Sequence, residues 1–384
     1  MTKILVLFTG GTIGSFKVKV NDHYVIGTKT ELEKQGISTE GLTQMLIQNY
    51  NNVYNINKEV SFDVCEIADV LSENMSFAKW NEITSAIKKQ DFSKYDGVII
   101  THGTDTLGYF ANYLSMILNK VSVPVFIVSS NYVLDDPRAN GNYNFQAACD
   151  YIKKIKIPGV YVTFRNTIDG EKKTRVIYGS RVMQCNPLTN DFESITNHGN
   201  VPLATVDEFG HIESVDDLCN TINGVNPYRK EDGSLINDLR SLKSNILLVE
   251  PYVGLDYFNY NLKKVDAVLH GLYHSGTACT DTDEVNNIIR FNRMVRNSGS
   301  DLYVGPFYGK DDKALYASAD SMVKAGINFV TNTSKENAYV KLALAYALAP
   351  LYANNQDQVS EYVEEFMNEE LNHEFINPPI KIKR

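Results

Sequence analysis

The sequence predicts an α/β protein: a larger N-terminal domain with a mostly parallel sheet flanked by helices, then a smaller C-terminal α/β domain. Three observations predict it. Short runs of consecutive apolar residues alternate with amphipathic segments, a pattern typical of parallel strands covered by helices on both faces. Residues 196–240 are instead rich in Asn, Asp, Gly and Pro, and the alternation then resumes. We therefore expect an N-terminal domain at 1–195, a linker at 196–240 and a C-terminal domain at 241–384.

The N-terminal domain contains five apolar runs that we predict to be strands: Ile4–Phe8, Phe62–Ala68, Gly97–Thr101, Val123–Ser130 and Gly159–Phe164. Three amphipathic segments between them are predicted helices: Trp80–Gln90, Leu107–Asn119 and Phe145–Ile155. The C-terminal domain has predicted strands at Ile246–Glu250, Ala267–Leu272 and Leu302–Pro306, and predicted helices at Asp283–Arg296 and Lys335–Leu348. Ligands of such sheets bind at the carboxyl ends of the strands, so polar residues that directly follow a strand are the first candidates for a site.

Composition narrows the class of ligand. The 384 residues carry a formal net charge of −9, which gives the chain no electrostatic reason to bind nucleic acid or an anionic membrane. No apolar run approaches the ~20 residues that span a bilayer, and the first run is too short for a secretory signal. The five cysteines are scattered and never spaced as C-x-x-C, which argues against zinc and disulfides and favours a reducing cytoplasm. We expect a cytoplasmic protein with a small-molecule substrate and no metal site.

Two clusters of glycine and hydroxyl residues follow strands directly. The first is TGGTIG at 9–14 and the second is THGTDT at 101–106. Because both stand at strand ends of one sheet, they could line a shared crevice, where glycine lets the backbone approach a ligand closely.

Three interpretations of these clusters compete. A nucleotide loop is disfavoured because the P-loop lysine and the G-x-G-x-x-G spacing are both missing. A plain glycine-rich turn accounts for the glycines, but not for hydroxyl residues at the same place in both clusters. A threonine nucleophile would need a nearby base and an orienting group, and Asp105 beside Thr104 supplies a carboxylate. We expect His102, in the second cluster, to orient the loop rather than to act as the base.

TGGTI and HGTDT, about 90 residues apart and in this order, resemble the motifs of the bacterial-type L-asparaginase and glutaminase family. Four further segments resemble that family: LSENM at 71–75, the strand and loop at 123–148, SRV at 180–182 and YHSGTA at 273–278. The resemblance covers essentially the whole chain.

The resemblance implies an enzyme that hydrolyses L-asparagine to L-aspartate and ammonia without a metal or organic cofactor. It implies that Thr12 is the nucleophile on a mobile loop, and that Tyr24 polarises or positions it. Thr104 matches a second threonine, and Asp105 matches the aspartate that binds the α-amino group of the substrate.

The same resemblance supplies a substrate-binding set and an assembly. Ser72 and Glu73 match the residues that hold the α-carboxylate and α-amino groups, and Thr277 stands where many members have asparagine. A zwitterionic amino acid does need a carboxylate for its ammonium and hydrogen-bond donors for its carboxylate. Because family members place the active site at a subunit contact, we expect a homodimer or a homotetramer.

One position departs from the family pattern. Gln184 stands where the family has the lysine that joins Thr104 and Asp105 as the base, and an amide cannot take a proton at neutral pH. Lys172 or Lys173 could substitute from another direction. Two alternatives therefore stay open: hydrolysis of glutamine or another small amide, since one methylene changes binding by only ~1–3 kcal/mol, and a non-catalytic amino-acid-binding protein.

Overall fold

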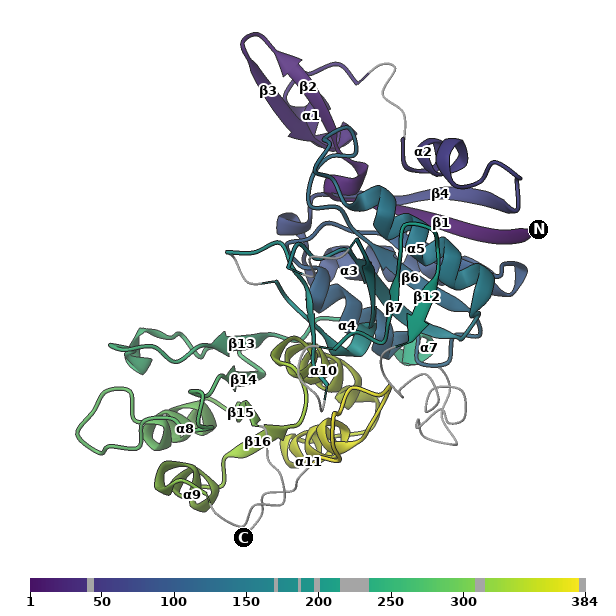
Figure 1. Ribbon diagram of the computed structural model, residues 1–384. Helices are drawn as coiled ribbons and strands as arrows, with labels where there is room; N and C mark the ends of the chain where they lie inside the picture. The colour runs from purple at the N-terminus through teal and green to yellow at the C-terminus, as the bar shows by residue number, and fades with distance from the viewer. Residues whose placement is uncertain are drawn as a thin grey trace. The chain divides into compact units, whose positions relative to one another are not determined.

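The computed structural model describes residues 1–39, 45–168, 172–185, 188–196, 201–214, 235–307 and 315–379 (Figure 1). The chain divides into two compact units, Met1–Asn237 and Asp238–Arg384. Within the described ranges, no helix combines the length and the apolar character needed to cross a bilayer.

The first unit is built on an eight-stranded sheet in which the five strands from β7 to β4 run parallel. In sheet order the strands are β12 (Ile212–Ser214), β11 (Ala204–Val206), β8 (Thr174–Tyr178), β7 (Gly159–Phe164), β6 (Pro124–Val128), β5 (Gly97–Thr101), β1 (Thr2–Gly10) and β4 (Val60–Val70). The strands β8, β11 and β12 extend the sheet in antiparallel fashion beyond β7.

The central strands of this sheet are buried throughout, because helices cover both of its faces. All residues of β5, β6 and β7 are buried. The helices are α1 (Lys29–Lys34), α2 (Met45–Val53), α3 (Phe77–Ile87), α4 (Leu107–Ile117), α5 (Gly141–Lys154) and α7 (Leu235–Asp238). Figure 1 shows α2 and α5 on one side of the sheet and α3 and α4 on the other. Tyr50 of α2 and Phe145 of α5 join the core that contains Val6, while Trp80 of α3 stacks on Tyr113 of α4 at 4.7 Å. Each buried side chain of this size stabilises the fold by ~1.5–3 kcal/mol.

Short elements complete the first unit. A two-stranded hairpin, β2 (Phe16–Val20) and β3 (His23–Gly27), follows the first motif, and β9 (Val182–Met183) pairs with β10 (Glu193–Ser194). Among the described residues of both units, the 3₁₀ turns are η1 (Thr12–Gly14), η2 (Ser72–Asn74), η3 (Phe92–Lys94), η4 (Gly179–Arg181), η5 (Tyr257–Asn259) and η6 (Ala349–Leu351).

The second unit has a four-stranded parallel sheet with its own core. The strands are β13 (Ile246–Val249), β14 (Ala267–His270), β15 (Asp301–Phe307) and β16 (Asn328–Thr331), and the helices are α8 (Ile288–Asn297), α9 (Ala317–Lys324), α10 (Lys335–Leu348) and α11 (Gln356–Asn368). A buried ion pair, Lys341 Nζ to Glu374 at 2.6 Å, ties the segment after α11 to α10. The Glu374 carboxylate also accepts the N–H groups of Leu371 and Asn372, so its charge is compensated inside the protein.

The predicted fold class is confirmed, and β5, β7 and α10 have the predicted bounds. The helix α8 begins at Ile288 rather than Asp283, because the Asn287 side chain accepts the N–H of Arg290 and caps it there. The expected linker at 196–240 differs from the structure in its first part, which supplies β11 and β12 of the large sheet. Strands of three residues are too short to give a readable pattern. Residues 197–200 and 215–234 of that segment lie outside the described residues.

Candidate active site

The two glycine–hydroxyl clusters meet because β1 and β5 are adjacent parallel strands. Their ends are joined by Thr9, whose N–H donates to Thr101 Oγ1 at 3.2 Å and whose hydroxyl donates to the Thr101 carbonyl. Both groups are fully buried. The two clusters therefore lie side by side at the carboxyl ends of these two strands.

Beyond these threonines the two backbones touch. A Cβ atom on Gly11 would overlap the backbone of Gly103, and a Cβ atom on Gly103 would overlap the side chain of Ser72. Gly11 also has φ = 78°, a conformation that other residues adopt only with strain. Three segments far apart in the sequence, TGGT, HGTD and LSEN, are thus packed together with no space for a side chain at Gly11 or Gly103.

Thr12 begins the turn η1 directly after this contact. The turn is held by Ser15, whose hydroxyl donates to the Gly11 carbonyl at 2.8 Å and whose N–H donates to the Thr12 carbonyl at 3.1 Å. The Thr12 side chain is half-buried, and it makes no hydrogen bond to any described residue. Its hydroxyl is therefore available to a ligand.

Asp105 is oriented by Ser72. The Ser72 hydroxyl donates to Asp105 Oδ2 at 2.9 Å and accepts the Asp105 N–H at 3.1 Å, while Thr106 Oγ1 donates to the Ser72 carbonyl at 3.0 Å. Ser72 is buried, whereas Asp105 is exposed and has no cationic side chain within 4.0 Å in the described part of the chain. This carboxylate is ready to accept an ammonium group.

Gln184 lies beside this pair and is committed to the backbone. Its Nε2 donates to the Thr104 carbonyl at 2.8 Å, and its Oε1 accepts the Gly108 N–H in the first turn of α4 at 2.9 Å. An amide in this position can hold neighbours in place but cannot accept a proton from a hydroxyl. The thiol of Cys185 lies 3.6 Å from the same Nε2.

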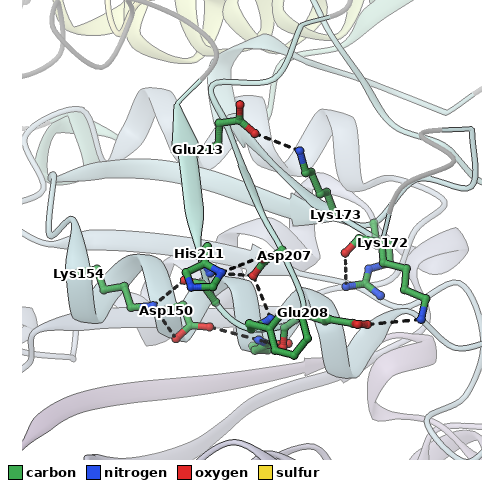
Figure 2. A network of polar contacts seen from close by, with 12 residues as sticks. Asp150, Lys154, Lys172, Lys173, Asp207, Glu208, His211 and Glu213 are labelled. Carbon is green, nitrogen blue, oxygen red and sulfur yellow. Dashed lines mark hydrogen bonds and ion pairs between the residues drawn. The ribbon is translucent and has the colours of Figure 1, made fainter.

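Lys172 and Lys173 are engaged elsewhere. Lys172 Nζ lies 3.7 Å from Glu208 and Lys173 Nζ lies 3.0 Å from Glu213, as Figure 2 shows. Both lysines precede β8, which is three strands from β5 in the sheet, a separation of about 14 Å at the usual strand spacing. The structure does not bring either lysine to Thr104.

The polar network around these lysines joins the β11–β12 turn to α5. Asp207 accepts the N–H of His211 at 2.8 Å and closes the turn between β11 and β12. The ammonium of Lys154, on α5, donates to the carbonyl of Gly210 in this turn and lies 3.9 Å from Asp150 (Figure 2). The network fastens the edge of the sheet to α5. Within the described ranges, no group of three or more His, Cys, Asp or Glu side chains could hold a metal ion.

The remaining predicted residues are positioned by other elements. Tyr24 lies on β3 with 59% of its surface exposed, and the Lys17 ammonium lies 4.7 Å from the centroid of its ring. Tyr24 makes no hydrogen bond to Thr12 in this structure. Glu73 is exposed in η2, next to Ser72. Thr277 belongs to the second unit, where its carbonyl accepts the Tyr273 N–H at 2.9 Å.

His102 contacts both the second motif and α4. Its Nδ1 lies 2.7 Å from the Gly103 carbonyl, and its ring stacks on Phe110 of α4 at 4.3 Å. Burial lowers the pKa of His102 to about 4, against the opposing effects of the Gly103 carbonyl and Asp105. The ring is therefore neutral near pH 7, and the expectation that it orients the loop fits this geometry.

The two clusters can be found from the sequence, but the contacts between them cannot. The partners of Gln184, the close approach at Gly108 and the bond from Ser72 to Asp105 appear only in the structure. The one local signal is the glycine at 108, in a helix where glycine is otherwise unfavourable.

Comparisons with known proteins match the chain to one family. The family model "Asparaginase, N-terminal" matches residues 3–216. An L-asparaginase of Thermococcus kodakarensis is 28% identical over 210 residues, which are 54% of this chain and 55% of that protein. A subunit of the glutamyl-tRNA(Gln) amidotransferase of the same organism is 27% identical over 89% of this chain and 71% of its own length.

Solved structures share the fold. L-asparaginase I of Vibrio cholerae has a TM-score of 0.70 and 21% identity, covering 97% of this chain and 99% of its own. The thermostable L-asparaginase of Thermococcus kodakarensis has a TM-score of 0.68 at 21% identity, covering 98% and 99%.

Because His102 is buried and neutral, we expect the stability of the first unit to fall at acidic pH. Its pKa is depressed in the folded state, so its stabilising contribution is complete above pH 6.5 and is lost as pH falls towards 4. The loss amounts to about 3 kcal/mol at ~1.4 kcal/mol per pH unit. Denaturant unfolding followed by the single tryptophan, Trp80, reports on this unit. We expect His102→Gln to flatten the dependence and His23→Gln, at an exposed site, to leave it unchanged; equal slopes for both variants would contradict the assignment.

Proposed function

The chain belongs to the asparaginase family, and we propose that it is an L-asparaginase-type amidohydrolase that converts L-asparagine and water to L-aspartate and ammonia. One observation carries this proposal. The uncommitted hydroxyl of Thr12 and the orienting pair of Ser72 and Asp105 belong to segments packed together at the ends of β1, β4 and β5. A nucleophile and an ammonium-binding carboxylate are what an amino-acid amide requires.

We propose a two-step reaction at Thr12. Its oxygen attacks the side-chain amide carbon, the C–N bond breaks, and ammonia leaves with the hydroxyl proton, giving an acyl-enzyme ester. Water then cleaves the ester, which releases aspartate and restores the hydroxyl. Backbone N–H groups of the glycine-rich turn are the natural donors to the developing oxyanion, each typically worth ~3 kcal/mol. Asp105 binds the α-amino group, and the reaction uses no metal or organic cofactor.

We propose that the reaction proceeds without a lysine at position 184. The amide of Gln184 makes two backbone hydrogen bonds and is no base. Tyr24 is the group that the family resemblance assigns to Thr12, and it is exposed on the β2–β3 hairpin. We expect turnover to be slow, or to be adapted to a different amide.

Two other functions are candidates. Glutamine or another small amide could be the substrate. The relatives include an amidotransferase subunit as well as an L-asparaginase, which leaves the identity of the amide open. Gln184 favours a second candidate, a protein that binds an amino acid without turning it over. We further propose a cytoplasmic homodimer or homotetramer. The support is the family resemblance and the fold shared with a probable cytoplasmic L-asparaginase from Campylobacter jejuni, at a TM-score of 0.60 and 18% identity.

Replacing the nucleophile tests the reaction. Thr12→Ala should abolish ammonia release from asparagine, because no other atom replaces the attacking oxygen. Thr12→Ser keeps a hydroxyl and should retain part of the activity. Circular dichroism and thermal unfolding should match the wild type, since the Thr12 side chain makes no hydrogen bond to any described residue. Activity above a few per cent in Thr12→Ala would exclude this residue as the nucleophile.

Neutralising Asp105 tests substrate recognition. Asp105→Asn should raise the Michaelis constant for asparagine about 10- to 100-fold, the size expected when a hydrogen bond to a charged group is lost. Asp63→Asn, another exposed acid of the first unit, is the control and should change little. Steady-state kinetics with wild-type constants for Asp105→Asn would remove its proposed role.

The missing lysine gives a third test. Lys172→Ala and Lys173→Ala should each leave turnover within about twofold of the wild type. The Lys172 ammonium pairs with Glu208, in the turn between β11 and β12, and the Lys173 ammonium pairs with Glu213, on β12. Loss of turnover without unfolding would identify a displaced catalytic lysine. If the wild type is inert towards asparagine, glutamine and related amides while Gln184→Lys is active, the binding-protein candidate replaces the enzyme.

A further inference from the structure

The peptide group between Thr104 and Asp105 is held at both of its ends. Its carbonyl accepts Nε2 of Gln184 at 2.8 Å, and its N–H donates to the hydroxyl of Ser72 at 3.1 Å. A peptide group is planar, so two hydrogen bonds on opposite edges fix its orientation. That orientation sets the direction in which the side chains of Thr104 and Asp105 leave the backbone.

The other end of the Gln184 amide is anchored as well. Its Oε1 accepts the N–H of Gly108 at 2.9 Å, one of the donors that the first turn of a helix leaves without an intrahelical partner. The approach is close: a Cβ atom on Gly108 would lie 2.8 Å from the backbone N and 3.0 Å from the Cα of Gln184. The side chain of Gln184 therefore bridges the Thr104–Asp105 peptide to the start of α4.

We propose that Gln184 is a positioning residue for recognition of the substrate ammonium, acting through the Thr104–Asp105 peptide on the carboxylate of Asp105. This inference rests on the proposed function, in which Asp105 binds the α-amino group. In this role Gln184 acts on Asp105 through the peptide and takes no part in the bond-making steps. The chain thus uses this position to orient a carboxylate by hydrogen bonding, without a charge of its own.

A purely structural role would have a different signature. A helix cap that only stabilises α4 would affect every ligand of the site to the same extent. A positioning role affects ligands that carry the ammonium and spares those that lack it. Succinamate is asparagine without the α-amino group, so the pair of substrates separates the two roles.

The experiment compares kcat/KM for asparagine and for succinamate in Gln184→Met, which keeps the length of the side chain and removes both hydrogen bonds. We expect kcat/KM for asparagine to fall about five- to tenfold, the size expected from one or two lost hydrogen bonds, with the Michaelis constant carrying most of the change. The value for succinamate should stay within about twofold. An equal loss for both substrates would overturn the proposal.

Two further variants separate positioning from general loosening. Gly108→Ala should displace Gln184 and give the same selective loss, with no further loss in the double variant with Gln184→Met. Asn112 ties the same two segments together at a different place, since its Nδ2 donates to the carbonyls of Gly108 and Val182. Asn112→Ala should lower stability and shift both substrates equally. A selective loss in Asn112→Ala would contradict the proposal, and Gly108→Ala answers the question if Gln184→Met does not fold.

Failure of the proposed function gives a different result. If the wild type hydrolyses neither substrate, calorimetry with L-aspartate and succinate makes the same comparison by binding alone. Weaker binding of aspartate with unchanged binding of succinate in Gln184→Met would support the positioning role in a non-catalytic protein. Equal weakening of both, or of neither, would overturn it.

Discussion

The site depends on one constraint, the backbone contact between Gly11 and Gly103 at the ends of two adjacent parallel strands. Neither position has space for a Cβ atom, because Gly103 faces Gly11 on one side and Ser72 on the other. A side chain at either glycine would separate the turn that carries Thr12 from the turn that carries Asp105. An exposed carboxylate and an uncommitted hydroxyl act together only at short range. The proposed chemistry of the site therefore depends on glycine at positions 11 and 103.

Much of this could be predicted from the sequence, and the reasons are physical. The strands β5 and β7 are buried along their whole length and consist mainly of apolar residues, so their bounds follow from hydrophobicity. The residues that follow a parallel strand lie at the ligand-binding edge of the sheet. The partners of Gln184 and of Lys172 could not be predicted, because each is set by tertiary contacts between segments 36 or more residues apart. Thr12 and Asp105 can be proposed as site residues from the sequence because they follow predicted strands closely. The hairpin that carries Tyr24 cannot be predicted in this way, because exposed strands give little hydrophobic signal.

The two units support their strand ends in the same way. In each, a histidine at the end of a parallel strand directs Nδ1 at the carbonyl of the following glycine: His102 at Gly103 and His270 at Gly271. Burial lowers the pKa of both rings to about 4. His270 has a further partner, since its Nε2 lies 2.8 Å from the hydroxyl of Tyr257. A neutral buried imidazole is thus a recurring brace for a tight turn in this chain, which argues for a structural role of the histidine in the HGTDT motif.

Ser72 illustrates how the hydrogen-bond inventory limits the roles of a residue. A hydroxyl has one proton, and here that proton goes to Asp105 Oδ2 while the oxygen accepts the Asp105 N–H. Ser72 can therefore donate to a substrate carboxylate only by rotating its proton away from Asp105. Binding of an ammonium requires no such exchange, because an ionised carboxylate has about four acceptor sites and Asp105 can keep Ser72 while accepting a further donor. The protein groups that would bind the ammonium of a zwitterionic ligand are thus already in position. Binding of the ligand carboxylate would depend on other donors or on rotation of the Ser72 hydroxyl.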